Sequence, residues 1–220
     1  MTAESSESSA PAIAPGALLA IDTSIGTSVA LTIGDTVVEH GSPDERGHTE
    51  VVGDLIARVF AEAGVPPSEV AAVVVGIGPG PFTGLRVGIA AAKAFATGLG
   101  VPLLPISGHE AAAYDAMPDR EDAGPVRVLQ DARRRELFVT EYAGLDGVGL
   151  PLRVGEPRLL ARADYVEEAR DVWPEGIPAS TLLWLARLRL RAGRGFEPDR
   201  ALYLRSPDVY PSAGPKRVST

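Results

Sequence analysis

The stretch VAAVVVGIGPGPFTGLRVGIAAAKAFAT, residues 70–97, decides the fold class. Its first eight residues are almost continuously apolar and are bounded by turn formers, as is typical of a parallel strand covered on both faces. A loop rich in glycine and proline follows, and residues 83–97 are alanine-rich, which favours a helix. The apolar run 101–106 predicts another strand. A strand, a helix and a strand in this order indicate an α/β protein with a parallel sheet.

The segments before this stretch predict an antiparallel meander followed by a helix. Short β-prone runs separated by turns cover residues 18–24, 28–33 and 36–41. Between residues 49 and 63, apolar residues that include Val52, Leu55 and Val59 recur at helical spacing. The first half of the chain is therefore expected to run as three strands, helix, strand, helix, strand.

The second half begins in the same way. Residues 126–131, 136–142 and 152–160 are candidate strands, and residues 163–170 and 180–192 are candidate helices. Two copies of the same start suggest two related α/β lobes with a cleft between them. Because Pro174 and Pro178 argue against a central strand in the short connection 171–179, we expect the second lobe to lack one strand and one helix. The expected division is a disordered tail over 1–15, lobes over 16–106 and 107–210, and a flexible tail over 211–220.

Composition sets the class of protein. The 220 residues are 45% hydrophobic with a mean hydropathy of +0.08, which is enough to bury a core. Arg86 and Lys93 interrupt the longest apolar candidate, so no membrane span is expected. The N-terminal residues lack the basic start and apolar middle of a secretory signal. The absence of cysteine excludes disulfides and thiolate chemistry and fits a reducing compartment, so we expect a cytoplasmic protein.

The charge of the chain argues against nucleic acid as a direct partner. A formal net charge of -8 repels polyanions as a whole, and the arginines at 133–135 and 187–194 are local exceptions that we interpret as solvated surface. No stretch of the sequence combines basic and aromatic residues in an RNA-binding platform. The isolated chain is therefore expected to bind RNA only weakly.

The loop GPGPFTG, residues 78–84, allows two interpretations. Backbone N–H groups at the start of a helix attract anions, and glycines would let a phosphate approach. The loop lacks the lysine and the spacing of a P-loop, however, and Pro79 and Pro81 each remove a donor. We favour a rigid turn between a strand and a helix.

Two carboxylates raise the alternative of an enzyme. Asp22 and Asp131 end corresponding strands of the two halves, where two-lobed kinases keep a carboxylate, so a phosphotransferase that uses ATP in the cleft is the alternative function. Ser24 and Arg133 stand where glycine would let backbone amides meet a phosphate, which argues against it.

No other catalytic pattern is present. The three histidines, His40, His48 and His109, have no zinc-site spacing, and we expect each at the surface. No serine lies in a G-x-S-x-G turn. The sequence therefore predicts no catalytic residue, no cofactor and no metal.

The helix over 83–97 has a second feature. Thr83, Arg86, Ala90, Lys93 and Thr97 share one narrow face, and apolar residues cover most of the remaining surface. The small residues Gly84, Gly88 and Ala92 allow a close approach, which core packing and a partner surface explain equally well. If a partner docks here and on the helix over 49–63, the candidate interface residues are Val52, Leu55, Val59, Arg86, Val87, Ala90, Lys93 and Ala94.

Seven motifs occur together in one order between residues 18 and 211: LLAIDTS, SVAL, GHTE, GPGPFTGLRVG, PISGHEAAA, DARRRELFVTEY and ALYLRSPDVYP. In this combination the chain resembles the bacterial TsaB family. The resemblance implies a two-lobed fold of the actin, Hsp70 and sugar-kinase type, built from an RNase H-like βββαβα repeat. The connection 171–179 departs from the family pattern, because the family usually has a glycine-containing strand and more chain there.

The resemblance also implies a function. It implies a non-catalytic subunit, without a cofactor, of the complex that transfers threonylcarbamoyl to adenosine 37 of tRNA. The implied partners are a TsaD-like catalytic subunit and a TsaE-like P-loop ATPase, and tRNA is met only through the complex, with no membrane involved. A homodimer of the isolated chain is left open.

Overall fold

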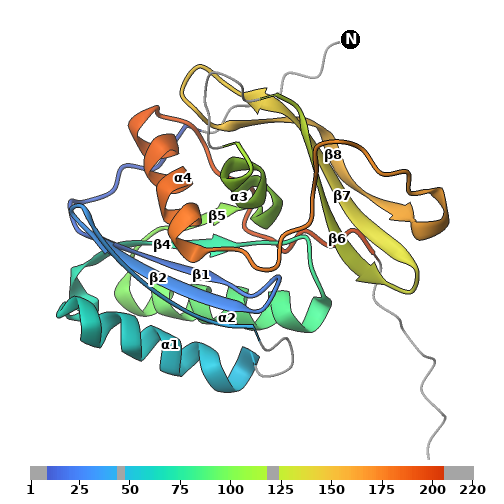
Figure 1. Ribbon diagram of the computed structural model, residues 1–220. Coiled ribbons are helices and arrows are strands. Elements are labelled where there is room, and N and C mark those ends of the chain that lie inside the picture. The colour runs from blue at the N-terminus through green and yellow to red at the C-terminus, as the bar shows by residue number, and fades with distance from the viewer. Residues whose placement is uncertain (1–8, 44–47, 118–123, 206–220) are drawn as a thin grey trace, which may run out of the picture.

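The computed structural model describes residues 9–43, 48–117 and 124–205, and its elements form two sheets with four α-helices (Figure 1). The elements of the first sheet and its helices are β1 (Ala17–Asp22), β2 (Thr27–Ile33), β3 (Thr36–Ser42), α1 (His48–Ala63), β4 (Val70–Gly76), α2 (Phe82–Leu99), β5 (Leu103–Ile106) and α3 (Gly108–Asp115). Those that follow are β6 (Val126–Arg133), β7 (Glu136–Leu145), β8 (Pro151–Ala161), β9 (Asp171–Val172) and α4 (Ala179–Arg191). Short 3-10 turns cover Pro67–Glu69 and Arg162–Asp164.

The first sheet has the order β3-β2-β1-β4-β5. The first three strands are antiparallel, and β4 and β5 run parallel to β1, as the sequence predicts. Because side chains alternate along β1, Leu19 and Ile21 face one hydrophobic core while Leu18 and Ala20 face another. Figure 1 shows α1 and α2 on one side of this sheet and α3 and α4 on the other.

The second sheet repeats the first in shortened form. Its order is β8-β7-β6-β9, with β9 parallel to β6, which matches β3-β2-β1-β4 and leaves out a counterpart of β5. The chain therefore has the two-lobed α/β fold of the actin, Hsp70 and sugar-kinase type with an abbreviated second lobe. The prediction of the fold class is confirmed.

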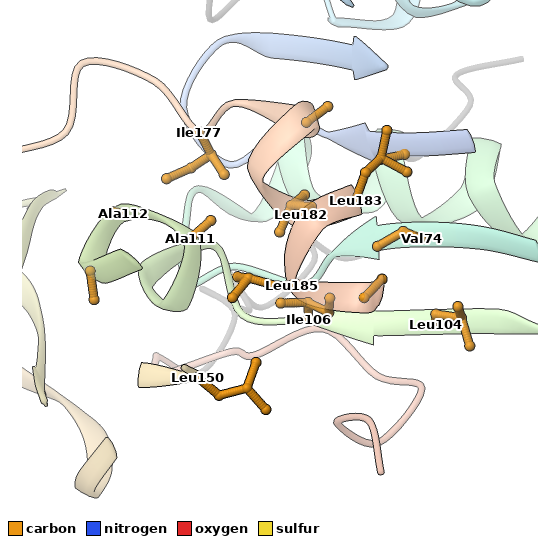
Figure 2. Close-up of a cluster of buried hydrophobic side chains, with 14 of the residues drawn as sticks. Val74, Leu104, Ile106, Ala111, Ala112, Leu150, Ile177, Leu182, Leu183 and Leu185 are labelled. Atoms are coloured by element: carbon orange, nitrogen blue, oxygen red, sulfur yellow. The ribbon is translucent and has the colours of Figure 1, made fainter. Parts of the chain in front are cut away.

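The space between the sheets is filled rather than open. Figure 2 shows leucines of α4, among them Leu182 and Leu185, beside Val74, Leu104 and Ile106 of the first sheet. The same hydrophobic cluster includes Val126, Val128 and Tyr142 of the second sheet. The sequence analysis expected a cleft between the lobes, and a shared core lies between the sheets here instead. We still propose the lobe boundary near residue 106, which separates the two sheets although it does not separate their core.

The predicted helix over 163–170 is wrong, because the structure has only the 3-10 turn Arg162–Asp164 there. The segment is held on the sheet by Arg127, whose Nε and Nη2 donate to the two carboxylate oxygens of Asp171 at 2.7 and 2.8 Å. Tyr165 lies over the Arg127 guanidinium at 5.6 Å and donates its hydroxyl to Asp171. Hydrogen bonds among Arg127, Tyr165 and Asp171 therefore hold this segment in a conformation that is not helical.

The connection 171–179 contains the two-residue strand β9, which pairs with β6 at the sheet edge and which the sequence analysis did not expect. That analysis also missed α3. All but two of the eight residues of α3 are buried, so it lacks the polar face that marks an amphipathic helix.

The predicted disordered tail is only partly within the described residues. Residues 1–8 lie outside them, as does the predicted flexible tail over 211–220. Residues 9–15 lie against the fold: Ile13 packs against the shared core, and the Ala10 amide donates to the Gly193 carbonyl at 3.4 Å. Among the described residues, no helix is both long and apolar enough to cross a lipid bilayer.

Candidate functional site

Asp22, the last residue of β1, is enclosed by backbone. Its Oδ1 accepts hydrogen bonds from the amide and the hydroxyl of Ser24, at 2.8 and 2.6 Å. A Cβ at Gly76 would lie 1.7 Å from Oδ2, and a Cβ at Gly108 would lie 3.6 Å from it. Burial raises the pKa of the carboxyl to about 6, although the bonds from Ser24 act to lower it. A group this enclosed cannot meet a substrate without movement of the backbone around it.

Asp131 lies in a different environment from Asp22. It is exposed on β6, and its Oδ1 accepts from the backbone amide of Arg133 at 2.8 Å. The described part of the chain contains no group of three or more His, Asp and Glu side chains that could hold a metal ion. The geometry gives the alternative of a phosphotransferase no support.

The glycine- and proline-rich loop is used as a turn anchored by its backbone. The Gly78 carbonyl accepts from the Gly108 amide at 2.8 Å and from the Ser107 hydroxyl at 3.1 Å. Gly80 lies against Ser24, where a Cβ would be 3.0 Å from the Ser24 carbonyl oxygen. The glycines thus let three chain segments meet closely, which agrees with the interpretation as a rigid turn.

The small residues of α2 serve core packing. The Thr23 hydroxyl donates to the Gly84 carbonyl at 2.7 Å and accepts from the Gly88 amide at 3.1 Å. A Cβ at Gly88 would lie 2.2 Å from that hydroxyl oxygen. Gly84 and Gly88 therefore let α2 approach the end of β1, not a second helix.

His109 is a buried residue, and the expectation of a surface histidine is wrong for it. Its Nδ1 lies 2.8 Å from Thr140 Oγ1, and its Nε2 lies 3.3 Å from Gln130 Oε1. Burial lowers its pKa to about 4, with a partial opposing effect from Gln130, so the ring is neutral near neutral pH. Because the Gln130 side-chain amide also donates to the Ser24 carbonyl at 3.1 Å, this network joins the two lobes. His40 pairs with Glu62 at the surface, and the side chain of His48 lies outside the description.

The structure places the predicted interface residues of α1 in the core. Val52, Leu55 and Val59 are between 0% and 8% exposed, on the side of α1 that packs against the first sheet. The opposite side of α1 bears Gly53 and Ala57, which are exposed. The charged residues Asp54, Arg58 and Glu62 are exposed on α1 as well.

The predicted residues of α2 divide into two groups. Ala90 and Ala94 are exposed, and Val87 is half-buried beside the core of the first lobe. The other two contact the C-terminal segment 196–205. Arg86 donates to the Tyr203 hydroxyl at 3.1 Å, and Lys93 pairs with Asp199 at 2.9 Å.

Comparisons with known proteins agree with the motifs. The family model described as TsaD, tRNA N6-adenosine threonylcarbamoyltransferase, matches residues 43–149. An uncharacterized protein of Mycobacterium leprae is 35% identical over 191 residues, which are 80% of this chain and 49% of that protein. The tRNA threonylcarbamoyladenosine biosynthesis protein TsaB of Escherichia coli is 34% identical over 128 residues, covering 57% of this chain and 54% of that protein. The chain thus spans about half the length of these curated relatives.

A solved structure extends the likeness over most of the chain. A protein of Pseudomonas aeruginosa, described as similar to peptidase YeaZ, superposes with a TM-score of 0.73 at 28% identity. The match covers 86% of this chain and 100% of the other. Both lobes, including the abbreviated second one, are therefore shared with a known protein.

Proposed function

This chain belongs to the TsaB family, and we propose that it is a non-catalytic subunit of the complex that forms threonylcarbamoyladenosine in tRNA. The observation that carries the non-catalytic part is the enclosure of Asp22, whose Oδ2 faces the backbone of Gly76 instead of an open site. The name of the Escherichia coli relative supports the pathway. In this proposal a partner subunit supplies the catalytic residues.

The partners that fit this role are a TsaD-like catalytic subunit and a TsaE-like ATPase. The match of the TsaD family model to residues 43–149 supports a shared fold between this chain and a catalytic subunit. Related folds can pair through equivalent surfaces, since an interface between like subunits is often self-complementary. In this proposal the chain works in the cytoplasm, binds no cofactor and meets tRNA within the complex. In the absence of its partner, a homodimer would use the same surface.

We place the docking surface on the outward sides of α1 and α2. The two helices lie side by side below the first sheet (Figure 1), joined by Phe60 and Phe95, whose rings stack at 5.7 Å. Small residues are exposed at four-residue spacing on both: Gly53, Ala57 and Ala61 on α1, and Ala90, Ala94 and Gly98 on α2. Nothing within 4 Å would meet a Cβ at Gly53 or Gly98. These exposed small residues suit the close approach of partner helices, and the charged Asp54, Arg58 and Glu62 lie beside them on α1.

Co-purification with the TsaD-like subunit of the same organism tests the proposal. We expect a stable complex that, with the ATPase and a threonylcarbamoyl donor, modifies tRNA, whereas omission of this chain abolishes the modification. The isolated chain should hydrolyse ATP no faster than background. ATP turnover that Asp22→Asn or Asp131→Asn removes would instead establish the phosphotransferase.

A further inference from the structure

A basic surface lies at the hairpin between β6 and β7, in a protein whose net charge is -8. Arg133, Arg134 and Arg135 are consecutive and exposed. The Arg162 amide donates to the Arg135 carbonyl at 2.7 Å, and the Arg205 guanidinium contacts the Arg133 carbonyl and pairs with Glu136. The three hairpin arginines and Arg205 thus gather at one end of the second sheet, beside the carboxylates of Asp131 and Glu136, while the guanidinium of Arg162 lies over the ring of Trp173.

The backbone of this hairpin is strained. Arg133, Arg134 and Arg135 have φ angles of 61°, 53° and 63°, in the left-handed region that favours glycine or asparagine. Two-residue hairpin turns need such angles, and Asn-Gly would meet the need at lower cost. Strain of this kind concentrates at functional sites. Since glycine or asparagine would be less strained here, we attribute the three arginines to a function of their charged side chains.

Aromatic rings lie beside the arginines. Phe82, at the start of α2, and Tyr203, in the C-terminal segment, have ring centroids 4.5 Å apart. The Arg86 guanidinium lies 5.6 Å from the Phe82 ring and 5.7 Å from the Tyr203 ring. Tyr203 remains 41% exposed, so its ring is accessible.

A pocket of about 170 Å³ joins the two groups. Phe82, Phe138 and Tyr203 line it together with Arg133, Arg134 and Arg205. Aromatic faces next to arginines are the combination that single-stranded nucleic acids meet in proteins, because bases stack on the rings while phosphates pair with the guanidinium groups. The sequence analysis found no such platform in any one stretch of the chain, and the fold brings these rings and arginines together from residues far apart in the sequence.

We propose that this arginine-aromatic pocket binds unpaired nucleotides of RNA, with a base against Tyr203 and Phe82 and backbone phosphates on the arginines of the hairpin. The inference rests on the proposed function in its choice of RNA, since tRNA is the substrate of the complex. It adds a direct contact between this chain and tRNA. An acidic protein segment would use the arginines but would leave the aromatic rings without a role.

Binding of a fluorescein-labelled anticodon stem-loop RNA to the full chain, measured by anisotropy at low ionic strength, tests the arginines. The double substitution Arg134→Ala with Arg135→Ala should weaken binding about tenfold. It should also reduce the slope of log affinity against log salt concentration by the equivalent of about two phosphate contacts. Because alanine is as strained as arginine at positive φ, the backbone cost is unchanged. Arg58→Ala with Arg191→Ala, at two exposed arginines on α1 and α4, is the matched control and should leave affinity within about twofold, since it removes the same two charges elsewhere.

A second pair of variants tests the aromatic part. Tyr203→Leu removes the ring and should weaken RNA binding by about fivefold or more, the usual effect of losing one stacked base. Tyr203→Phe keeps the ring, loses only the hydroxyl that accepts from Arg86, and should bind like the unmodified chain. Circular dichroism confirms that each variant is folded.

Four results would overturn the inference. Equal loss in the hairpin double variant and in the control double variant would mean that only net charge matters. Binding of ATP that depends on the same residues, without binding of the RNA, would make the pocket a mononucleotide site. Loss of affinity for the TsaD-like subunit with RNA binding unchanged would make the hairpin a protein contact.

If the complex modifies tRNA while the isolated chain does not bind RNA, the proposed function stands and this inference fails. If the chain binds the RNA through these residues but supports no modification, the proposed function fails and the inference stands.

Discussion

At the scale of single residues, Asp22 is a buried carboxyl whose Oδ2 has no hydrogen-bond partner among the described residues. Its pKa is raised from the ordinary 3.8 to about 6 by burial. The protonated form is therefore favoured by folding, and this contribution to stability is complete below pH 3.8 and is lost as the pH rises through about 6. At neutral pH the native state therefore holds an ionised carboxylate that is fully buried.

Asp22→Asn should stabilise the protein at pH 7, because the neutral amide keeps the shape without the charge. Since one pKa unit corresponds to about 1.4 kcal/mol, the gain is about 3 kcal/mol at most and vanishes near pH 4. Urea unfolding at both pH values measures it. An equal effect at pH 4 and pH 7 would mean that lost hydrogen bonds to Ser24, not ionisation, decide the outcome.

The turn Arg134–Arg135 gives a second prediction at this scale. Replacing Arg135 by glycine should raise the free energy of unfolding by about 1 kcal/mol, because glycine adopts its φ of 63° without steric cost. Thermal unfolding, with Arg135→Ala as control, measures the difference. A stability no higher than that of the alanine variant would show that the positive φ carries little strain.

At the scale of elements, α2 combines a buried and an exposed side. Gly88, Ile89 and Ala92 pack on the first sheet, and Ala90 and Ala94 are exposed on the other side. Val87 lies between, half-buried against the core, so its substitution would mix folding with docking. Ala94 is the cleaner probe of the proposed docking surface.

Ala94→Glu should leave the isolated chain folded and weaken association with the TsaD-like subunit at least tenfold, because the charge loses its water in the complex. Ala163→Glu, at an exposed alanine of the second lobe, should leave the affinity unchanged. Calorimetric titration compares the two. Equal affinities in the two folded variants would move the interface away from α2.

At the scale of the whole molecule, the two lobes share one core, and a buried ion pair joins the two helices that fill it. Arg189 on α4 donates to both carboxylate oxygens of Glu110 on α3, at 2.6 and 2.8 Å. Burial raises the pKa of Glu110, and the positive charge of Arg189 opposes this. Because α3 and α4 fill the space between the sheets, neither lobe can lose its packing alone.

We therefore expect one cooperative unfolding transition, with tryptophan fluorescence and far-ultraviolet circular dichroism changing together. Arg189→Met leaves the Glu110 carboxyl buried without its partner and should cost about 3–5 kcal/mol, shifting both signals by the same amount. Arg191→Met, an exposed neighbour on α4, should have little effect. Two separate transitions would mean that the lobes fold independently despite their common core.

The sequence by itself determined the fold class and most elements. Continuous apolar strands such as 70–77, alternating runs and the repeated strand order are local patterns that burial on one or both faces imposes, so they can be recognised without coordinates. Motifs in a fixed order pointed to the TsaB family in the same way. The helix over 163–170 failed because its polar pattern had no apolar side to bury, and α3 was missed because nearly every side of it is buried.

Only the tertiary structure decided which side of each helix is covered and which distant residues meet. Helical spacing alone could not tell that Val52, Leu55 and Val59 pack against the sheet while Gly53 and Ala57 face outward. Nor could it bring Phe82, the hairpin arginines and Tyr203 into one pocket, since more than a hundred residues separate Phe82 from Tyr203. The physical reason is that periodicity records how often a chain turns toward a core, whereas contacts between distant segments depend on how whole layers stack.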